Sequence, residues 1–141
     1  MRVAPSSPPA GRRAARSFRR NPASLLAKAN RITRGADYRT TVRRGARLTG
    51  ANTVLYFRQN PDSEVVRFGF IVGKTVGIAI RRNLVRRRLK AVAYELLPQL
   101  SPGVDVVIRA LPASAQAEWA SLHEEVSRAV SRFTSRGSVR R

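Results

Sequence analysis

The spacing of apolar positions along the chain predicts three helices and three strands. Apolar residues recur every three or four positions over residues 34–44, 81–97 and 114–133, as they do on one side of an α-helix. Residues 53–59, 65–72 and 104–110 are apolar in continuous or alternating runs, which is typical of strands. A strong turn signal, Asn60-Pro61-Asp62-Ser63, separates the first two strands, so we expect them to be antiparallel. This order of elements predicts one α/β domain.

The helix predicted over residues 81–97 carries an apolar side and a cationic side next to each other. Its apolar positions follow spacings of four, three and four: Val85, Leu89, Val92 and Leu96. Its cationic side contains residues spaced four apart and their neighbours: Arg82, Arg86 and Lys90, widened by Asn83 and Arg87. Like charges at this spacing destabilise an isolated helix, so an anionic partner, most simply a polyanion, would offset the repulsion. A basic face that contacts only solvent is the alternative.

Apolar and aromatic residues on the first helix and the first strand form a second candidate surface. Tyr38 and Val42 lie four apart on one side of helix 34–44, and Val54 and Tyr56 share one side of strand 53–59. Packing of the helix on the sheet and binding of a ligand both explain these residues. Gly69 leaves one side of strand 65–72 open, so another backbone or a ligand can approach there.

The segment 73–80 joins the second strand to the basic helix and contains two glycines and one lysine. Glycines near a helix start are typical of phosphate-binding loops, but the spacing is not that of a Walker loop. Nucleotide hydrolysis is therefore rejected. A contact between Lys74, backbone N–H groups and an RNA phosphate stays open.

The last predicted helix is expected to begin at Ser114 as its N-cap and to bury one apolar stripe. That stripe comprises Trp119, Leu122, Val126, Val130 and Phe133. We expect Trp119 to be a core residue rather than a platform for a ligand. His123 is expected on the surface.

Composition narrows the function classes further. The 141 residues include 28 Lys and Arg against eight Asp and Glu, and the net charge of +20 favours a nucleic acid or an anionic membrane as partner. No apolar run is long enough for a membrane span or a signal-peptide core, so a cytoplasmic location is expected. The absence of cysteine excludes disulfides, thiolate metal sites and cysteine catalysis, and one histidine with scattered carboxylates offers little for acid–base catalysis.

Both ends of the chain differ from its middle. Residues 1–27 contain four prolines, six arginines and no acid, so we expect a disordered basic extension that adds non-specific phosphate contacts. An organelle transit peptide and a natural start further downstream are the alternatives. Residues 28–134 are expected to form the folded domain, and residues 135–141 a basic C-terminal tail.

The string from Phe68 to Arg87 resembles the signature of the protein subunit of bacterial ribonuclease P. It contains Gly77-Ile78-Ala79 and then Arg82-Asn83-Leu84-Val85-Arg86-Arg87, similar to the family's Gly-x-Ala segment and its Arg-Asn-x-x-(Lys/Arg)-Arg helix start. Asn30-Arg31-Ile32 and Asp37-Tyr38 also resemble the family's opening, so the likeness covers about residues 28–134. Three residues depart from the family's pattern: Thr75 replaces a second lysine, Ile78 an asparagine and Val42 an aromatic residue.

This resemblance implies a fold, a partner and a substrate. The fold would be a two-layer α/β (α+β) sandwich in αβββαβα order, like a ribosomal-protein second domain. Its βαβ crossover would be left-handed, whereas such crossovers are nearly always right-handed. The chain would bind the catalytic RNA subunit of ribonuclease P and precursor tRNA. The holoenzyme would remove the 5′ leader as an endoribonuclease, without a small-molecule cofactor or a membrane.

The resemblance also assigns roles to individual residues. The family's basic helix faces the RNA subunit, which corresponds here to Arg81, Arg82, Asn83, Arg86, Arg87 and Lys90. The family's first helix and one sheet face form a cleft for the single-stranded leader, and the matching positions are Tyr38, Val42, Val54, Tyr56 and Lys74.

The carboxylates form no recognisable metal-ligand motif. No residue of the chain is therefore expected to be catalytic, and magnesium ions are expected to be held mainly by the RNA subunit. The rival interpretations are an architectural or ribosomal RNA-binding protein with a similar fold and a protein-only nuclease.

Overall fold

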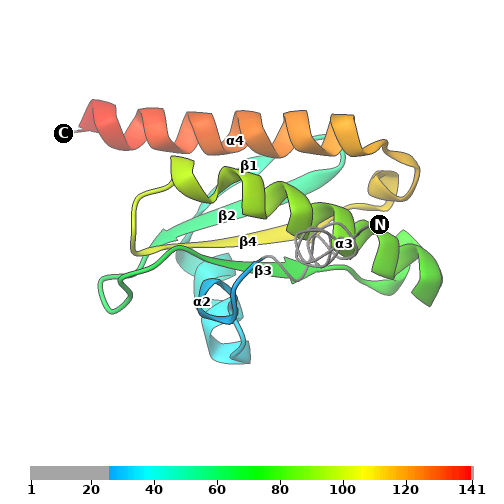
Figure 1. Ribbon diagram of the computed structural model, residues 1–141, viewed down its shortest axis with the longest axis horizontal. Coiled ribbons are helices and arrows are strands. Elements are labelled where there is room, and N and C mark those ends of the chain that lie inside the picture. The colour runs from blue at the N-terminus through cyan, green and yellow to red at the C-terminus, as the bar shows by residue number, and fades with distance from the viewer. Residues whose placement is uncertain (1–25, 141) are drawn as a thin grey trace, which may run out of the picture.

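The computed structural model describes residues 26–140, and it contains one strand more than the apolar pattern alone predicts (Figure 1). Side chains are described to residue 135. The helices are α2 (Gly35–Arg44), α3 (Ala79–Leu96) and α4 (Trp119–Arg140), with short 3₁₀ helices η2 (Lys28–Asn30), η3 (Lys74–Val76), η4 (Leu97–Gln99) and η5 (Pro112–Gln116). The strands are β1 (Ala46–Thr49), β2 (Thr53–Gln59), β3 (Arg67–Ile71) and β4 (Val104–Ala110).

The four strands form one sheet in the order β1-β2-β4-β3. β2 is antiparallel to both β1 and β4, and β3 is parallel to β4. Helices α3 and α4 lie on one face of this sheet and α2 lies on the other (Figure 1). The predicted αβββαβα order and the α/β sandwich are confirmed. The handedness of the β3–α3–β4 crossover stays a prediction.

The larger core lies between the sheet and helices α3 and α4. The predicted apolar stripe of α3 is at most 1% exposed along its length: Val85, Leu89, Val92 and Leu96. Burial of one such side chain stabilises the fold by about 1.5–3 kcal/mol. On α4, Phe133 stacks on Phe57 of β2, with the two ring centroids 4.5 Å apart. The same helix buries Leu122, Val126 and Val130 completely.

The smaller core lies between the sheet and α2. The ring of Tyr38 packs against Gly69 in β3, where a Cβ atom on residue 69 would lie only 2.5 Å from a Tyr38 ring carbon. The Tyr38 hydroxyl accepts a hydrogen bond of 3.1 Å from the backbone N–H of Phe70. The open side predicted at Gly69 is therefore filled by a side chain of the same protein.

The strand pairing differs from the sequence-based expectation in two ways. Residues 46–49 form the edge strand β1, which the apolar pattern did not predict because only Leu48 of this strand is buried. β3 runs antiparallel to β2 as expected, but β4 lies between the two. The connection through α3 returns the chain to the centre of the sheet, so the apolar β4 takes the position covered on both faces.

The helix termini also differ from the expectation. α2 begins at Gly35, one residue after the predicted start, and Arg34 takes its N-cap position. Ser114 is not an N-cap: it lies in η5, where its hydroxyl donates to the Leu111 carbonyl. α4 begins at Trp119, which is 37% exposed rather than part of the core stripe.

The folded part extends into both of the predicted tails. α4 continues to Arg140, so the backbone of residues 135–140 is helical. At the other end, Leu26 is fully buried in the larger core, so the folded part includes at least two residues of the predicted extension. The rest of that extension, residues 1–25, lies outside the described residues.

The contact between Tyr38 and Gly69 gives a stability test. Gly69→Ala should lower the free energy of unfolding by about 1–3 kcal/mol, because the added methyl group overlaps the Tyr38 ring. Gly73→Ala is the matched control: its Cβ atom meets nothing within 4 Å, and the change should stay within about 0.5 kcal/mol. Urea denaturation measures both, and equal effects would show that Tyr38 does not pack on Gly69.

Candidate nucleic-acid interface

The cations of α3 lie beside its buried stripe and on the opposite side of the helix. Asn83 and Arg87 are exposed and lie on the side of the helix opposite the stripe. Arg82, Arg86 and Lys90 are half-buried along one border of the stripe. The structure therefore brings these five predicted residues together on one continuous helix surface.

Hydrogen bonds to neighbouring groups hold several of these side chains in place. The Arg82 Nε donates to the Gly77 carbonyl over 3.1 Å, and an Arg86 Nη donates to the Asn83 Oδ1 over 2.9 Å. Arg81 differs from the other predicted residues, because one of its Nη atoms donates to the carbonyl of Ala115 in η5. Part of the charge on this surface is thus pre-oriented by the protein.

No acidic side chain offsets the cations of α3 among the described residues. Among residues 26–135 the acids form ion pairs with Arg58, Arg67 and Arg128, and Glu95 contacts His123; none of these basic residues belongs to α3. The first turn of α3 contains no acid, and its N-cap residue, Ile78, makes no side-chain capping bond. The positive end of the helix dipole therefore adds to the positive potential of this surface.

Lys90 lies where its positive charge is disfavoured. Burial lowers the pKa of Lys90 below its ordinary value of 10.5, and the charges of Arg31 and Arg86 lower it further. Folding therefore places this ammonium group in an environment that disfavours its charge. An anion bound beside Lys90 would reverse that effect.

The second candidate surface lies on the α2 face of the sheet, and α2 covers a large part of it. Tyr56 is 6% exposed and Val54 is 4% exposed, and both belong to the small core. Tyr38 and Val42 on α2 are half-buried against them. Little of the Tyr56 ring is therefore open to stack on a base. Its substitution would report mainly on stability.

Arg109 and Arg47 lie on this face and were not singled out from the sequence, whereas Lys74, which follows β3, was. The strand register places Ile71, Arg109, Val54 and Thr49 in one row across the sheet. Arg109 is exposed in that row, Arg47 is exposed on the neighbouring strand, and Lys74 is exposed just after β3. Strand alternation could have identified Arg109, but the sequence did not reveal which face α2 covers.

The one fully buried acid of the described part holds the sheet together. Asp105 in β4 accepts hydrogen bonds from Arg67 at 2.8 and 3.0 Å, from Arg58 at 3.3 Å and from Asn60 at 3.1 Å. The hydrogen bond to Asp105 raises the pKa of Arg67. Because cations occupy both oxygens of Asp105, this carboxylate is not available to a metal ion.

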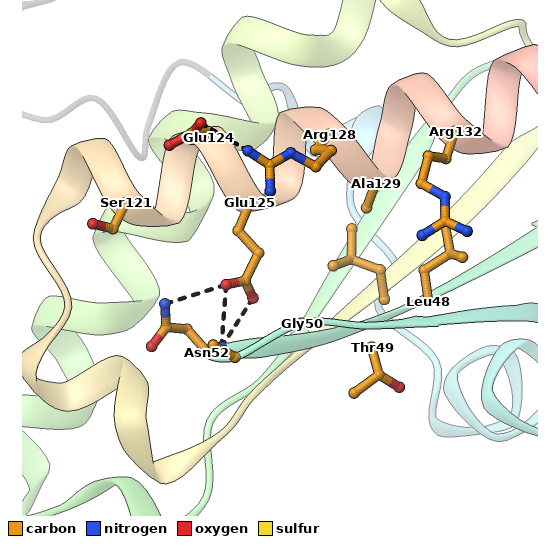
Figure 2. A pocket seen from close by; sticks show the side chains of 12 residues that line it. Leu48, Thr49, Gly50, Asn52, Ser121, Glu124, Glu125, Arg128, Ala129 and Arg132 are labelled. Carbon is orange, nitrogen blue, oxygen red and sulfur yellow. Dashed lines mark hydrogen bonds and ion pairs between the residues drawn. The ribbon is translucent and has the colours of Figure 1, made fainter.

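A hollow between α4 and the β1–β2 turn has a volume of about 370 Å³ (Figure 2). Glu125 reaches across it and accepts hydrogen bonds from Asn52 and from the Thr53 hydroxyl. Arg128 at its rim pairs with Glu124 over 2.8 Å, as Figure 2 shows. Acids therefore offset a cation here, which distinguishes this hollow from the surface of α3.

Neither metal binding nor membrane insertion is supported by the described residues. They contain no group of three His, Asp or Glu side chains close enough to hold a metal ion. This donor set does not fit a magnesium ion held by this part of the protein. None of the described helices is long and apolar enough to cross a membrane.

Comparison with known proteins identifies the family. A family model described as ribonuclease P matches residues 26–134. The chain belongs to the ribonuclease P protein family. The ribonuclease P protein component of Clavibacter michiganensis is 51% identical over 108 residues, which cover 77% of this chain and 96% of that protein. That of Mycobacteroides abscessus is 42% identical over 118 residues, covering 79% and 93% of the two chains.

Solved structures support the fold. A Staphylococcus aureus RNase P protein, described as a mutant with defective mRNA degradation activity, superposes with a TM-score of 0.72 at 22% identity, covering 79% of this chain and 93% of that one. The RNase P protein of Thermotoga maritima gives a TM-score of 0.64 at 21% identity, covering 72% and 96%.

The family and fold predicted from the sequence are therefore confirmed. With them, the chain is assigned to the protein subunit of ribonuclease P, an endoribonuclease of tRNA processing built around a partner RNA.

The environment of Lys90 gives a second stability test. Lys90→Met should raise the free energy of unfolding at pH 7 by up to about 0.5 kcal/mol, because it removes a partly buried charge and its repulsion with Arg31 and Arg86. The folded-state pKa of Lys90 is depressed, so the penalty is present at neutral pH and fades as pH rises towards 10.5. The gain should fade over the same range. Lys28→Met, at an exposed lysine of η2, is the matched control and should give no gain.

Proposed function

We propose that α3 of this ribonuclease P protein binds the catalytic RNA subunit while the α2 face of the sheet binds the 5′ leader of precursor tRNA. The observation that carries the proposal is the set of cations on α3, which are held in place and have no acidic partner among the described residues. A chain that charges one helix in this way without internal compensation gains stability when a polyanion binds.

The contribution of α3 is electrostatic. Arg82, Arg86, Arg87 and Lys90 would each neutralise phosphates and release counterions, and each contact would steepen the dependence of log Kd on log salt by roughly 0.7–0.9. Asn83 and Arg81 would add hydrogen bonds at the same helix start. The planar guanidinium groups suit phosphate oxygens, which they bind through two parallel N–H groups.

The contribution of the sheet face is positional. Half-buried Val42 and Ile71 offer apolar contact area, and exposed Arg109, Arg47 and Lys74 offer charge for a passing backbone. Tyr38, Val54 and Tyr56 would support this surface as packed residues. Their side chains are too buried to stack on bases. Such contacts are largely indifferent to base sequence, which suits an enzyme that meets many different leaders.

Hydrolysis itself is assigned to the RNA subunit. When bound, magnesium ions activate water and stabilise the leaving oxygen in phosphodiester cleavage. The described residues offer no cluster for them, which supports RNA as the main metal-holding partner. We place this reaction in the cytoplasm, because the relatives are bacterial proteins. An architectural RNA-binding role accounts for α3 but not for a leader surface on the opposite face.

A salt series tests the role of α3. Arg87→Ala should weaken binding to a bacterial ribonuclease P RNA about tenfold at moderate salt and lower the salt slope by about 0.7–0.9, because one phosphate contact is lost. Leader removal at low magnesium should fall in parallel. Arg128→Ala removes an equally charged, exposed arginine from α4 and serves as control. If both variants bound alike, α3 would not be the RNA-binding element.

A substrate comparison tests the sheet face. With the RNA subunit present, Arg109→Ala should weaken binding of precursor tRNA by about three- to tenfold and leave mature tRNA unaffected, because only the precursor carries a leader. Filter binding at fixed salt measures both affinities, again with Arg128→Ala as control. Equal losses for the two tRNAs would remove Arg109 from the leader surface and favour an architectural role.

A further inference from the structure

Two isoleucines at the start of α3 are far more exposed than any other large apolar residue of the described part. Ile78 is 72% exposed and Ile80 is 78% exposed, whereas the next most exposed, Tyr94, Val65 and Trp119, reach 42%, 38% and 37%. Isoleucine is among the residues most often buried in folded proteins. Two such exposed isoleucines, two positions apart in the sequence, therefore indicate a contact with something outside this chain.

The backbone around these isoleucines is held firmly, so their exposure is a built feature. Val76 just before them is 5% exposed, and Gly77 adopts φ of 149°, where a side chain would be strained. The Arg82 side chain donates to the Gly77 carbonyl, and the Arg82 backbone N–H donates to the Ile78 carbonyl over 2.9 Å. Arg81, the residue after Ile80, donates a hydrogen bond to the Ala115 carbonyl in η5.

The surroundings of the isoleucines define the chemistry of the partner. Arg81, Arg82, Asn83 and Lys74 flank them in the sequence, and no acid lies between Glu64 and Glu95. A partner that meets this surface must supply negative charge and flat apolar area close together. Unpaired nucleotides of an RNA supply both, because the phosphate lies next to an unstacked base.

From this arrangement we infer that Ile78 and Ile80 contact unpaired nucleobases of the RNA subunit, beside the phosphates that the α3 arginines neutralise. Apolar side chains are known to wedge against bases in this way in other nucleic-acid-binding proteins. This inference rests on the proposed function and deepens it: α3 would bind the RNA through two kinds of contact. The arginine contacts depend on salt, whereas the isoleucine contacts do not.

That difference makes the inference testable by a salt series. Ile78→Ser combined with Ile80→Ser should weaken binding to the ribonuclease P RNA about tenfold at every salt concentration, with an unchanged slope, because losing an apolar contact releases no counterions. Arg87→Ala should change the slope instead. Ile80→Phe, which keeps an apolar side chain, should retain wild-type affinity.

The matched control is Val65→Ser, which removes an exposed apolar side chain at the opposite end of β3 and should not change RNA binding. Thermal unfolding of each variant confirms that the fold is intact, as expected at exposed positions. An unchanged affinity, or a changed slope, in the double isoleucine variant would overturn the inference.

Two further outcomes separate this inference from the other possibilities. If Arg87→Ala also had no effect, the proposed function of α3 would fail with it, whereas an effect of Arg87→Ala alone would reject only the role of the isoleucines. Vesicles containing phosphatidylglycerol provide the second arm. Loss of vesicle binding in the double isoleucine variant, with RNA binding retained, would assign the isoleucines to a membrane surface instead.

Discussion

Burial of the apolar side of α3 holds the cations of this helix together against their mutual repulsion. Val85, Leu89 and Val92 are completely buried against the sheet and α4, so the helix cannot turn or unwind to separate its charges. Burial lowers the pKa of Lys90, and the nearby charges of Arg31 and Arg86 lower it further. The hydrophobic core thus keeps these cations close together despite their repulsion, and a bound polyanion would reduce that repulsion.

The placement of the acids complements this constraint. All eight lie between Asp37 and Glu125, and those that contact a basic side chain do so with Arg58, Arg67, Arg128 and His123 rather than with the cations of α3. Asp105 fixes the centre of the sheet, and Glu125 fixes the β1–β2 turn to α4. Carboxylates therefore stabilise the junctions of the fold and leave the cations of α3 without an acidic partner among the described residues.

The sequence predicted the parts of this protein that depend on local periodicity, and missed those that depend on tertiary placement. The stripe of α3 was correct because burial on one side of a helix leaves a repeat in the chain. β1 was missed because an edge strand with a single buried residue has no such repeat. The burial of Tyr56 depends on where α2 crosses the sheet, and the exposure of Trp119 depends on where α4 begins. The spacing of nearby residues does not predict either position.

The two proposed RNA surfaces lie in different layers of one small domain, and β3 connects them. Gly69 in β3 contacts Tyr38 of α2, and the chain leaving β3 runs through Lys74 into α3 within eight residues of Ile71. A sheet packed on both faces is stiff, because its interior is as dense as an organic crystal. The core itself would therefore set the distance between the two proposed surfaces, the RNA on α3 and the leader on the α2 face of the sheet. In the proposed arrangement this domain would align two RNA segments without needing chemistry of its own, since correct placement alone contributes a large part of catalysis.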